Sequence, residues 1–155
     1  MITDSKKNEA TREFVTLMIA GQVFGVEVKD IHDVFQPDRI TPVPLAPPEI
    51  CGVLNLRGRV VTAVDARVRL GLQVDEQSDQ PMAVGVDCNG ESYGLIVDSV
   101  NEVMRLPDSA YEANPVNLDP RWQEVSQGVY RLEDQLLVVL DLGRMLRFGE
   151  KSEAA

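Results

Sequence analysis

The feature of this sequence that most limits its fold is an internal repeat. Residues 21–34, GQVFGVEVKDIHDV, match residues 90–103, GESYGLIVDSVNEV, without a gap at an offset of 90 − 21 = 69 residues. Residues 52–70 match residues 128–146 at an offset of 128 − 52 = 76 residues. Glycines and acidic residues keep register along with the apolar positions, so chance similarity between apolar strands is the weaker explanation. The sequence therefore predicts two copies of one structural unit.

The repeat also divides the chain. A polar run at 75–80 joins the two copies, so we expect one lobe over about 12–73 and a second over about 80–148. Flexible tails are expected at 1–11 and 149–155. The second copy is longer by 76 − 69 = 7 residues, and this excess falls between Met104 and Gln127 in a proline-rich segment that predicts a longer loop.

Each copy is predicted to contain two hairpins with a helical segment between them. Asn89-Gly90 is a strong turn signal because both residues tolerate positive φ. The other expected turns are Gly21-Gln22, Arg57-Gly58 and Glu133-Asp134. The helical segments are predicted from apolar residues at a spacing of three, which are Val28, Ile31 and Val34 in one copy and Val97, Val100 and Val103 in the other.

Each copy is also predicted to end with a helix. Asp65 and Asp141 are expected to be the N-caps of a short helix at 66–70 and a longer C-terminal helix at 142–148. Because aromatic residues make up only 5% of the chain, the core must rely on Val, Leu and Ile, which suit strands. Short strands between Gly, Pro and Asn turns favour closed barrels. We expect a mainly β fold of two small antiparallel barrels packed side by side.

Composition excludes several functions. A net charge of −10 would repel a phosphate backbone, so nucleic acid is not an expected partner. The charge is uneven, because residues 12–73 carry seven acidic and seven basic side chains while residues 74–155 carry sixteen and six. Neither a signal sequence nor an apolar run of spanning length is present, so we expect a cytoplasmic protein without membrane insertion. Cys51 and Cys88 are expected to be buried thiols.

No pattern in the sequence indicates catalysis, a metal or another cofactor. Phosphate-binding, zinc-protease and nucleophile-elbow motifs are lacking, and His32 is the single histidine. Four carboxylates at element ends could pair as an acid and a base, but capping and solvation explain their placement better. They are Asp33, Asp65, Glu102 and Asp141.

From Glu13 to Phe148 the chain resembles the CheW coupling proteins of bacterial chemotaxis. The motifs that carry the resemblance are Ile40-Thr41-Pro42-Val43-Pro44, Pro47-Pro48, the run from Gly52 to Val61 (GVLNLRGRVV), and Val64-Asp65-Ala66-Arg67. Thr62 and Ala66 depart from the family pattern, which commonly has Pro and Leu there. The resemblance implies two five-stranded, SH3-like barrels, in agreement with the repeat.

The resemblance also implies a function. CheW proteins are non-enzymatic adaptors that link the cytoplasmic tips of chemoreceptors to the regulatory domain of the histidine kinase CheA in membrane-associated arrays, together with other CheW copies. An adaptor of a non-chemotactic chemosensory pathway, for pili or surface motility, is the alternative with the same fold. A small-ligand-binding barrel or an enzyme with a carboxylate site between the lobes is an alternative from another class.

Candidate docking residues follow from the resemblance. On the receptor side, the resemblance implies that Arg57, at a hairpin tip, pairs with Asp33. The alternative is that Arg57 is an ordinary solvated arginine in a turn. Four apolar residues are candidates for receptor contact in a groove between the lobes, with ordinary core as the alternative: Ile31, Val34, Val100 and Val103. The candidates for kinase docking, which could equally be buried strand residues, are Ile40, Val43, Val53 and Leu56.

Overall fold

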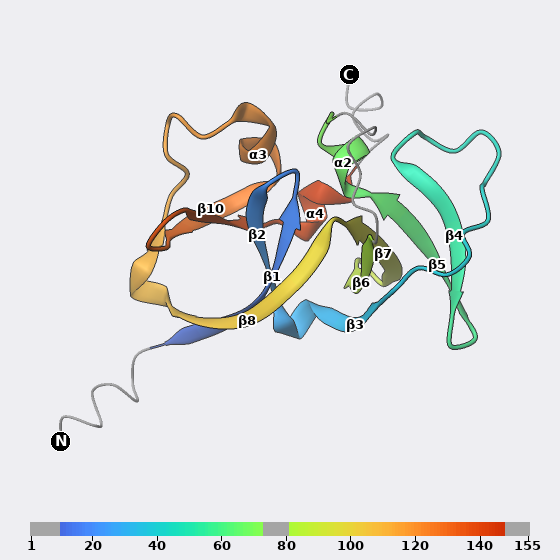
Figure 1. The fold of residues 1–155 in the computed structure, drawn as a ribbon, viewed down its shortest axis with the longest axis horizontal. Coiled ribbons are helices and arrows are strands. Elements are labelled where there is room, and N and C mark those ends of the chain that lie inside the picture. The colour runs from blue at the N-terminus through green and yellow to red at the C-terminus, as the bar shows by residue number, and fades with distance from the viewer. Residues whose placement is uncertain (1–9, 73–80, 148–155) are drawn as a thin grey trace.

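A computed structural model describes residues 10–72 and 81–147 (Figure 1). The expected tails, 1–11 and 149–155, and the joining run at 75–80 lie almost wholly outside these residues, although Thr11 already begins the first strand. The strands are β1 (Thr11–Ile19), β2 (Gln22–Glu27), β3 (Ile31–Phe35), β4 (Ile50–Leu56), β5 (Arg59–Asp65), β6 (Met82–Cys88), β7 (Glu91–Val97), β8 (Ser99–Pro107), β9 (Tyr111–Glu112), β10 (Ser126–Arg131) and β11 (Leu136–Leu140).

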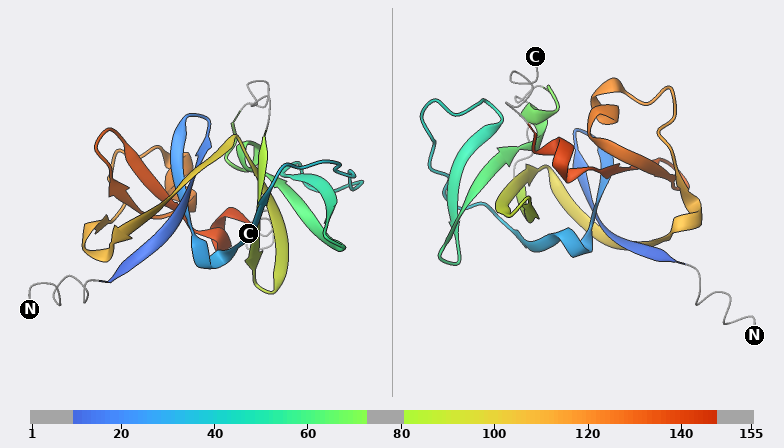
Figure 2. Two further views of the ribbon diagram at one scale, coloured as in Figure 1. Left: turned by 60° about the horizontal axis from the view of Figure 1, so that its bottom comes forward. Right: turned by 180° about the vertical axis from the view of Figure 1, so that it is seen from behind.

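The helices are all short, and the predicted mainly β fold is confirmed. The α-helices are α2 (Ala66–Arg69), α3 (Pro120–Val125) and α4 (Leu142–Met145), and the 3-10 turns are η1 (Val28–Asp30) and η2 (Asp108–Ala110). The strands form two curved sheets side by side (Figure 2). We call them the six-stranded lobe, with the order β8-β1-β2-β11-β10-β9, and the five-stranded lobe, with the order β3-β6-β7-β5-β4.

The internal repeat is visible in the pairing of the strands. Replacing each strand by its counterpart in the other copy converts the order β3-β6-β7-β5-β4 into β8-β1-β2-β11-β10. Each sheet also contains one parallel pair, β2 with β11 and β5 with β7, which departs from the expected antiparallel barrels. In these pairs Gly25 lies opposite Val139 and its counterpart Gly94 lies opposite Ala63. Equivalent residues therefore meet in equivalent registers.

The two sheets do not coincide with the two predicted stretches of the chain. The five-stranded lobe uses the continuous stretch 31–97, and the six-stranded lobe combines 11–27 with 99–140. The first hairpin, β1–β2, pairs with β8 and β11 of the second copy, while β6–β7 pairs with β3 and β5 of the first. Each hairpin thus completes the sheet of the other copy, which is why a cut at 73–80 does not separate the sheets.

The helical segments predicted from the spacing of three are also wrong beyond one turn. η1 is followed by β3, in which burial alternates with a period of two, so Ile31 and Phe35 face inward and Val34 faces outward. The counterpart segment, with Val100 and Val103, lies in β8. Both stretches are edge strands that pair with β6 and β1, and that backbone pairing outweighs the local spacing.

The segment predicted as a longer loop contains a helix that buries Trp122 and Val125. α3 begins at Pro120, and the Asp119 side chain caps it by accepting a hydrogen bond from the Arg121 N–H. The Trp122 ring packs edge-on against Phe24, with 5.3 Å between the ring centroids. The excess of the second copy therefore contributes to the core. The C-terminal helix, in contrast, is shorter than predicted and ends at Met145.

One apolar core joins the two lobes. It takes residues from β1 and β2, from β6 and β7, and from all three α-helices. A smaller cluster around Phe14 and Tyr130 lies in the six-stranded lobe, and another around Leu54 and Val61 lies in the five-stranded lobe. Because the largest cluster is shared, neither lobe buries its full apolar surface alone.

An ion pair also connects the lobes. Arg67 of α2 donates two hydrogen bonds to Asp98, of 2.9 and 2.8 Å, and the Ala20 N–H donates a third of 2.9 Å. The side chains of Arg67 and Asp98 are only 11% and 19% exposed. Burial favours the neutral acid, but these hydrogen bonds outweigh it and lower the pKa of Asp98. Asp98 lies where the chain passes from β7 of one lobe to β8 of the other, so the ion pair fixes this connection between the lobes.

Candidate functional site

Arg57 stands at the tip of the β4–β5 hairpin. Arg57 and Gly58 adopt φ values of 54° and 84°, and the Asn55 side chain accepts a hydrogen bond of 2.9 Å from the Gly58 N–H. This tight turn, predicted from the sequence, leaves the Arg57 side chain 79% exposed. One of its terminal nitrogens, Nη2, lies 3.5 Å from Oδ2 of Asp33. The structure thus brings together the two residues that the resemblance pairs.

The position of Asp33 depends on a glycine in the neighbouring strand. It follows a β-bulge at His32, opposite Gly85 of β6. A Cβ atom on Gly85 would lie 2.9 Å from the His32 ring, so glycine leaves the room that the bulge needs. The Asp33 carboxylate accepts a hydrogen bond of 2.8 Å from the Val34 N–H. Its side chain is 16% exposed, which fixes the carboxylate beside Arg57.

The four apolar candidates on the receptor side divide into two pairs. Ile31 and Val100 are half-buried and pack against the shared core. Val34 and Val103 are 38% and 59% exposed. All four lie on β3 and β8, which are edge strands of the two sheets and run along the lower side of the molecule in Figure 1. The exposed pair is therefore available to a partner, and the other pair supports the edges.

The apolar candidates on the kinase side lie around β4. Ile40 and Leu56 are half-buried against the small core of the five-stranded lobe, while Val43 is 42% exposed. The loop that carries Ile40 and Val43 is tied to β4 by hydrogen bonds of 2.7 and 2.8 Å between the backbones of Thr41 and Val53. Gly52, with φ of 149°, permits this close approach, because a Cβ atom there would overlap the Thr41 carbonyl.

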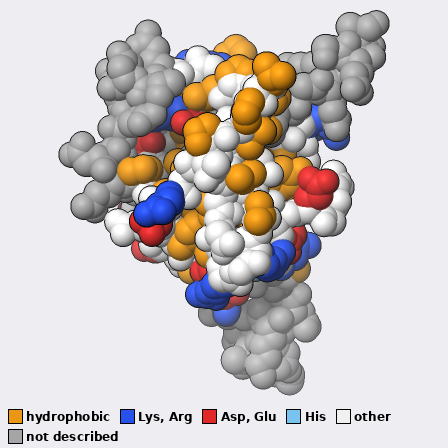
Figure 3. Space-filling model, turned by 90° about the vertical axis from the view of Figure 1, so that its right-hand side faces the viewer, with side chains coloured by type: hydrophobic (Ala, Val, Ile, Leu, Met, Phe, Trp, Pro, Cys, Tyr) orange, Lys and Arg blue, Asp and Glu red, His pale blue; other side chains and the backbone are white. Residues whose placement is uncertain are grey.

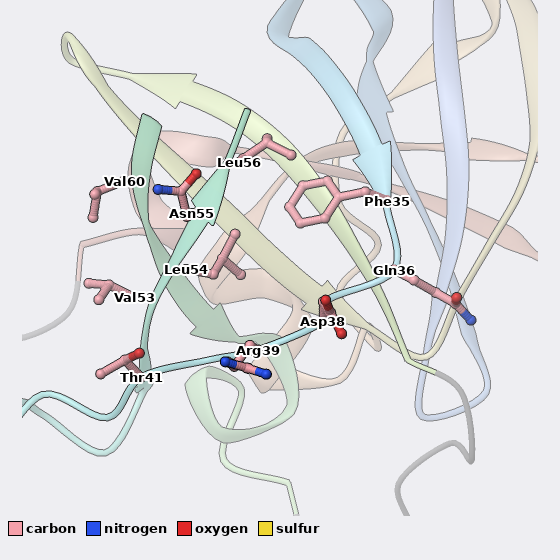
Figure 4. A pocket seen from close by; sticks show the side chains of 10 residues that line it. All are labelled: Phe35, Gln36, Asp38, Arg39, Thr41, Val53, Leu54, Asn55, Leu56 and Val60. Carbon is pink, nitrogen blue, oxygen red and sulfur yellow. The ribbon is translucent and has the colours of Figure 1, made fainter. Parts of the chain in front are cut away.

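An open hollow of about 580 Å³ lies beside this loop (Figure 4). In Figure 4 the Phe35 ring points from β3 toward β4, where Leu54 and Leu56 lie, and Arg39 and Thr41 close the other end. Val53 lines the hollow as well. The hollow is bordered by strand residues and by one loop, and its polar and apolar side chains are mixed.

Two exposed apolar residues of the five-stranded lobe were not among the candidates. Val60 of β5 is 70% exposed and Leu45, in the loop after Val43, is fully exposed. On the side of the molecule that carries β4 and β5, hydrophobic side chains gather in a band with charged side chains beside it (Figure 3). Leu45 could have been found from the sequence, because an apolar residue between prolines in a loop rarely reaches a core.

The carboxylates that could have formed an acid and base pair serve other purposes. Asp65 and Asp141 cap α2 and α4 by accepting hydrogen bonds from backbone N–H groups, as predicted. Glu102 is exposed on β8 of the six-stranded lobe, whereas Asp33 lies on β3 of the five-stranded lobe, paired with Arg57. Within 10–72 and 81–147, no cluster of His, Cys, Asp and Glu is arranged to hold a metal ion.

The two cysteines are half-buried thiols. Burial, aided by the nearby Asp65, raises the pKa of Cys51 to about 11, so this side chain stays protonated at neutral pH. In the part of the chain that the structure covers, no helix is long and apolar enough to cross a membrane.

Comparison with known proteins fits this architecture. The chain is 28% identical to the chemotaxis protein CheW of Bacillus subtilis, over 92% of this chain and 91% of that protein. It is 26% identical to the protein PilI of Pseudomonas aeruginosa, over 77% of this chain and 67% of that protein. The crystal structure of the scaffolding protein TtCheW from Thermoanaerobacter tengcongensis matches with a TM-score of 0.80 and 25% identity, over 90% of this chain and 95% of that one.

The family comparison covers nearly the whole of the described structure. The CheW-like domain matches residues 13–150, which include both lobes, the Arg57 hairpin and the loop over β4. This chain therefore belongs to the CheW-like domain family.

Proposed function

We propose that this protein is a cytoplasmic, non-catalytic adaptor that couples chemoreceptor tips to the regulatory domain of a CheA-type histidine kinase. The observation that carries the proposal is the exposed Arg57 beside Asp33, on a lobe that also displays an apolar band, within a chain that matches the CheW-like domain from 13 to 150. The polar pair and the apolar band give one lobe two different surfaces. A linker needs two surfaces of this kind, because its partners bind at the same time.

The receptor side of the proposal is the lower edge formed by β3 and β8. Arg57 offers charge-assisted hydrogen bonds, and Val34 and Val103 offer apolar contact to a helix. Ile31 and Val100 take a supporting role, because both pack against the shared core. An exposed ion pair such as Arg57 with Asp33 contributes only about 0 to 1 kcal/mol to stability. Its value is therefore in recognition.

The kinase side of the proposal is the apolar band at β4 and β5. Val43 and Leu45 in the loop before β4 and Val60 on β5 are exposed, while Ile40, Val53 and Leu56 line the nearby hollow or pack on the small core of this lobe. Exposed apolar side chains that gather on one face mark interaction sites in soluble proteins. The kinase domain proposed to bind here is itself a double barrel of this kind, as the resemblance implies, and other copies of the adaptor would extend the array.

The proposal is tested by binding each partner to variants that keep the fold. Arg57→Asp should abolish binding to a receptor tip fragment and leave binding to the kinase regulatory domain unchanged. Val43→Glu should do the reverse. Arg131→Asp, at a 61% exposed arginine of β10 in the other lobe, is the matched control and should bind both. If the folded wild-type protein binds neither partner at micromolar concentrations, the coupling function is wrong.

The similarity to PilI favours one second candidate, an adaptor of a chemosensory pathway that controls pili or surface motility. The fold and both surfaces would be the same, so only the partners differ. Competition between kinase regulatory domains from a chemotaxis pathway and from a pilus pathway decides between the two. Preference for the second domain would replace the first assignment.

A further inference from the structure

The two lobes carry small hollows at equivalent places. The hollow of the five-stranded lobe, of about 160 Å³, is lined by His32, Asp33, Leu56, Arg57, Arg59 and Val61. In the six-stranded lobe the hollow is about 220 Å³ and its lining includes Asn101, Glu102, Leu132 and Gln135. By the repeat offsets of 69 and 76 residues, these four are the counterparts of His32, Asp33, Leu56 and Arg59. The same site thus exists twice with different chemistry.

The difference extends to one pair of equivalent strands in the two lobes, β6–β7 and β1–β2. Asp87 lies opposite Ser92 in the β6–β7 pair, and their counterparts Met18 and Val23 lie opposite each other in the β1–β2 pair. Met18 and Val23 line the hollow of the six-stranded lobe. The hollow of the six-stranded lobe is therefore lined by apolar side chains at two positions whose counterparts in the five-stranded lobe, Asp87 and Ser92, are polar.

A chain of polar contacts holds Arg59 in the five-stranded lobe. Its Nη2 donates a hydrogen bond to Oγ of Ser92, and that hydroxyl donates in turn to Oδ1 of Asp87 over 2.8 Å. The same Asp87 oxygen lies 3.3 Å from Nε2 of His32. Because the serine hydroxyl has one proton, which goes to Asp87, its oxygen is left to accept from Arg59. The arginine is thereby oriented at the rim of the hollow.

Both arginines keep donors for another molecule. A guanidinium has five N–H donors in a planar fork. Among the described residues, Arg59 donates only to Ser92, and Arg57 has a single ion pair, at 3.5 Å. Asp33 and Asp87 are each engaged already, by the Val34 N–H and by Ser92. Two partly unused forks therefore border one hollow.

We propose that Arg59 and Arg57 together bind a carboxylate side chain, an Asp or Glu, of the protein partner that docks on this lobe. This inference rests on the proposed coupling function and specifies the chemistry of its receptor side. A carboxylate matches the bidentate geometry of guanidinium groups. A doubly charged phosphate is disfavoured because Asp33 lies beside Arg57 and Asp87 is linked to Arg59 through Ser92. The other lobe has Glu133 and Gln135 at the equivalent positions, where an acid is repelled, so of the two equivalent places only the one in the five-stranded lobe suits a carboxylate.

The test uses the full chain and two synthetic peptides. One is a capped, alanine-rich helical peptide with two Glu residues one turn apart, and its twin has Gln at both positions. Titration of each peptide is followed through the Nε–Hε signals of arginine side chains in NMR spectra. The Glu peptide should shift the signals of Arg57 and Arg59, and the Gln twin should shift neither. Equal shifts with both peptides would overturn the proposal.

Variants distinguish the contribution of Arg59 from that of Ser92, which orients it. Arg59→Gln introduces the residue type found at 135 and should weaken binding of the Glu peptide by about three- to tenfold, the loss of one charge-assisted hydrogen bond at an exposed site. Ser92→Val should weaken it less, and Ser92→Thr, which keeps the hydroxyl, should restore it. Arg131→Gln, on β10 of the other lobe, is the control and should bind as the wild type does.

The outcomes distinguish this site from the proposed function. If Arg59→Gln binds the Glu peptide and a receptor tip fragment as tightly as the wild type while Arg57→Gln does not, Arg59 has no part in recognition, and the coupling function stands without it. If the Glu peptide binds as expected but neither signalling partner does, the carboxylate site is real and the coupling function falls.

Discussion

The five-stranded and the six-stranded lobe share one frame and differ in what they present on it. Their strand orders, parallel registers and bulges correspond position by position. On this frame one lobe carries Arg57 and Arg59 around a charged hollow, and the other carries methionines and Gln135. The backbone positions that both lobes need are the ones that stayed alike. The side chains at the rims are where the lobes have diverged, and we place partner recognition there.

The lobes also differ in how the outer edge is covered. In the six-stranded lobe β9 pairs with β10, with Glu112 opposite Val129. In the five-stranded lobe the equivalent place has a single bridge between Thr41 and Val53. In both lobes the covering segment comes close to the sheet at a glycine, and these two glycines, Gly52 and Gly128, correspond in the repeat. The need for glycine at both positions can be tested by substituting each one.

The largest expected effect comes from Gly52→Ala and Gly128→Ala. The new Cβ atom would overlap the Thr41 carbonyl in one case and the Tyr111 side chain in the other. Overpacking and the strained φ of Gly52 predict a loss of about 3 kcal/mol in the free energy of unfolding for Gly52→Ala. Urea denaturation measures it, and a similar order of loss is expected for Gly128→Ala.

Gly90→Ala is the matched control for these variants. Gly90 has a φ of 81°, but its missing side chain would meet no atom within 4 Å. Only the backbone conformation is penalised, at about 1 kcal/mol. If Gly52→Ala costs no more than Gly90→Ala, the close approach of the loop to β4 does not contribute to stability.

A smaller effect is expected at the junction of the lobes, where the repeat is broken. Arg67 has Gly143 as its counterpart, so the pair with Asp98 exists only once. Arg67→Met keeps most of the apolar stem and leaves the Asp98 carboxylate without its charged donor. We expect the free energy of unfolding to fall by about 2 kcal/mol. An unchanged urea midpoint would show that the shared apolar core alone fixes the two lobes.

The same ion pair predicts a pH dependence. The pKa of Asp98 is lower in the folded protein, so its ionised form stabilises the fold fully above the unfolded pKa of about 3.9. That stabilisation is lost as the pH falls through the lower folded value. Asp98→Asn should therefore be less stable at pH 7 and should lose less further stability on acidification. Urea midpoints from pH 7 to pH 2 that run parallel for both proteins would contradict this.

The smallest expected effect on stability is that of Arg57→Gln. The side chain is 79% exposed and its ion pair is long, so the free energy of unfolding should change by less than about 1 kcal/mol. Thermal unfolding followed by circular dichroism measures the change. A loss well above 1 kcal/mol would mean that the hairpin tip supports the fold, which would weaken its assignment to recognition.

Local features of this fold could be predicted from the sequence. The turns at Asn89-Gly90 and Arg57-Gly58 and the caps Asp65 and Asp141 depend on a few neighbouring residues. The exchange of hairpins between the copies could not be predicted. The sequence of β1 does not distinguish β8 from its counterpart β3 as a pairing partner, and register depends on contacts distant in sequence. The sequence analysis did not predict α3, although Trp122 and Val125 have helical spacing after the start at Asp119-Pro120.

The site was predictable only where a resemblance supplied it. Spacing alone left Arg57 as a solvated turn residue, and the pairing with Asp33 came from the family. Arg59 was missed because Ser92, which holds it, lies 33 residues away along the chain. Extending the repeat by its own offset to Met18 and Asp87 would have shown that equivalent strand positions carry different chemistry.

The proposed coupling function requires that two surfaces of one small protein are occupied at once. The most direct test mixes the full chain with a receptor tip fragment and a kinase regulatory domain and measures the mass of the complex by light scattering after size-exclusion chromatography. We predict a single species whose mass is the sum of all three components. Separate two-component complexes, in which one partner displaces the other, would contradict the claim.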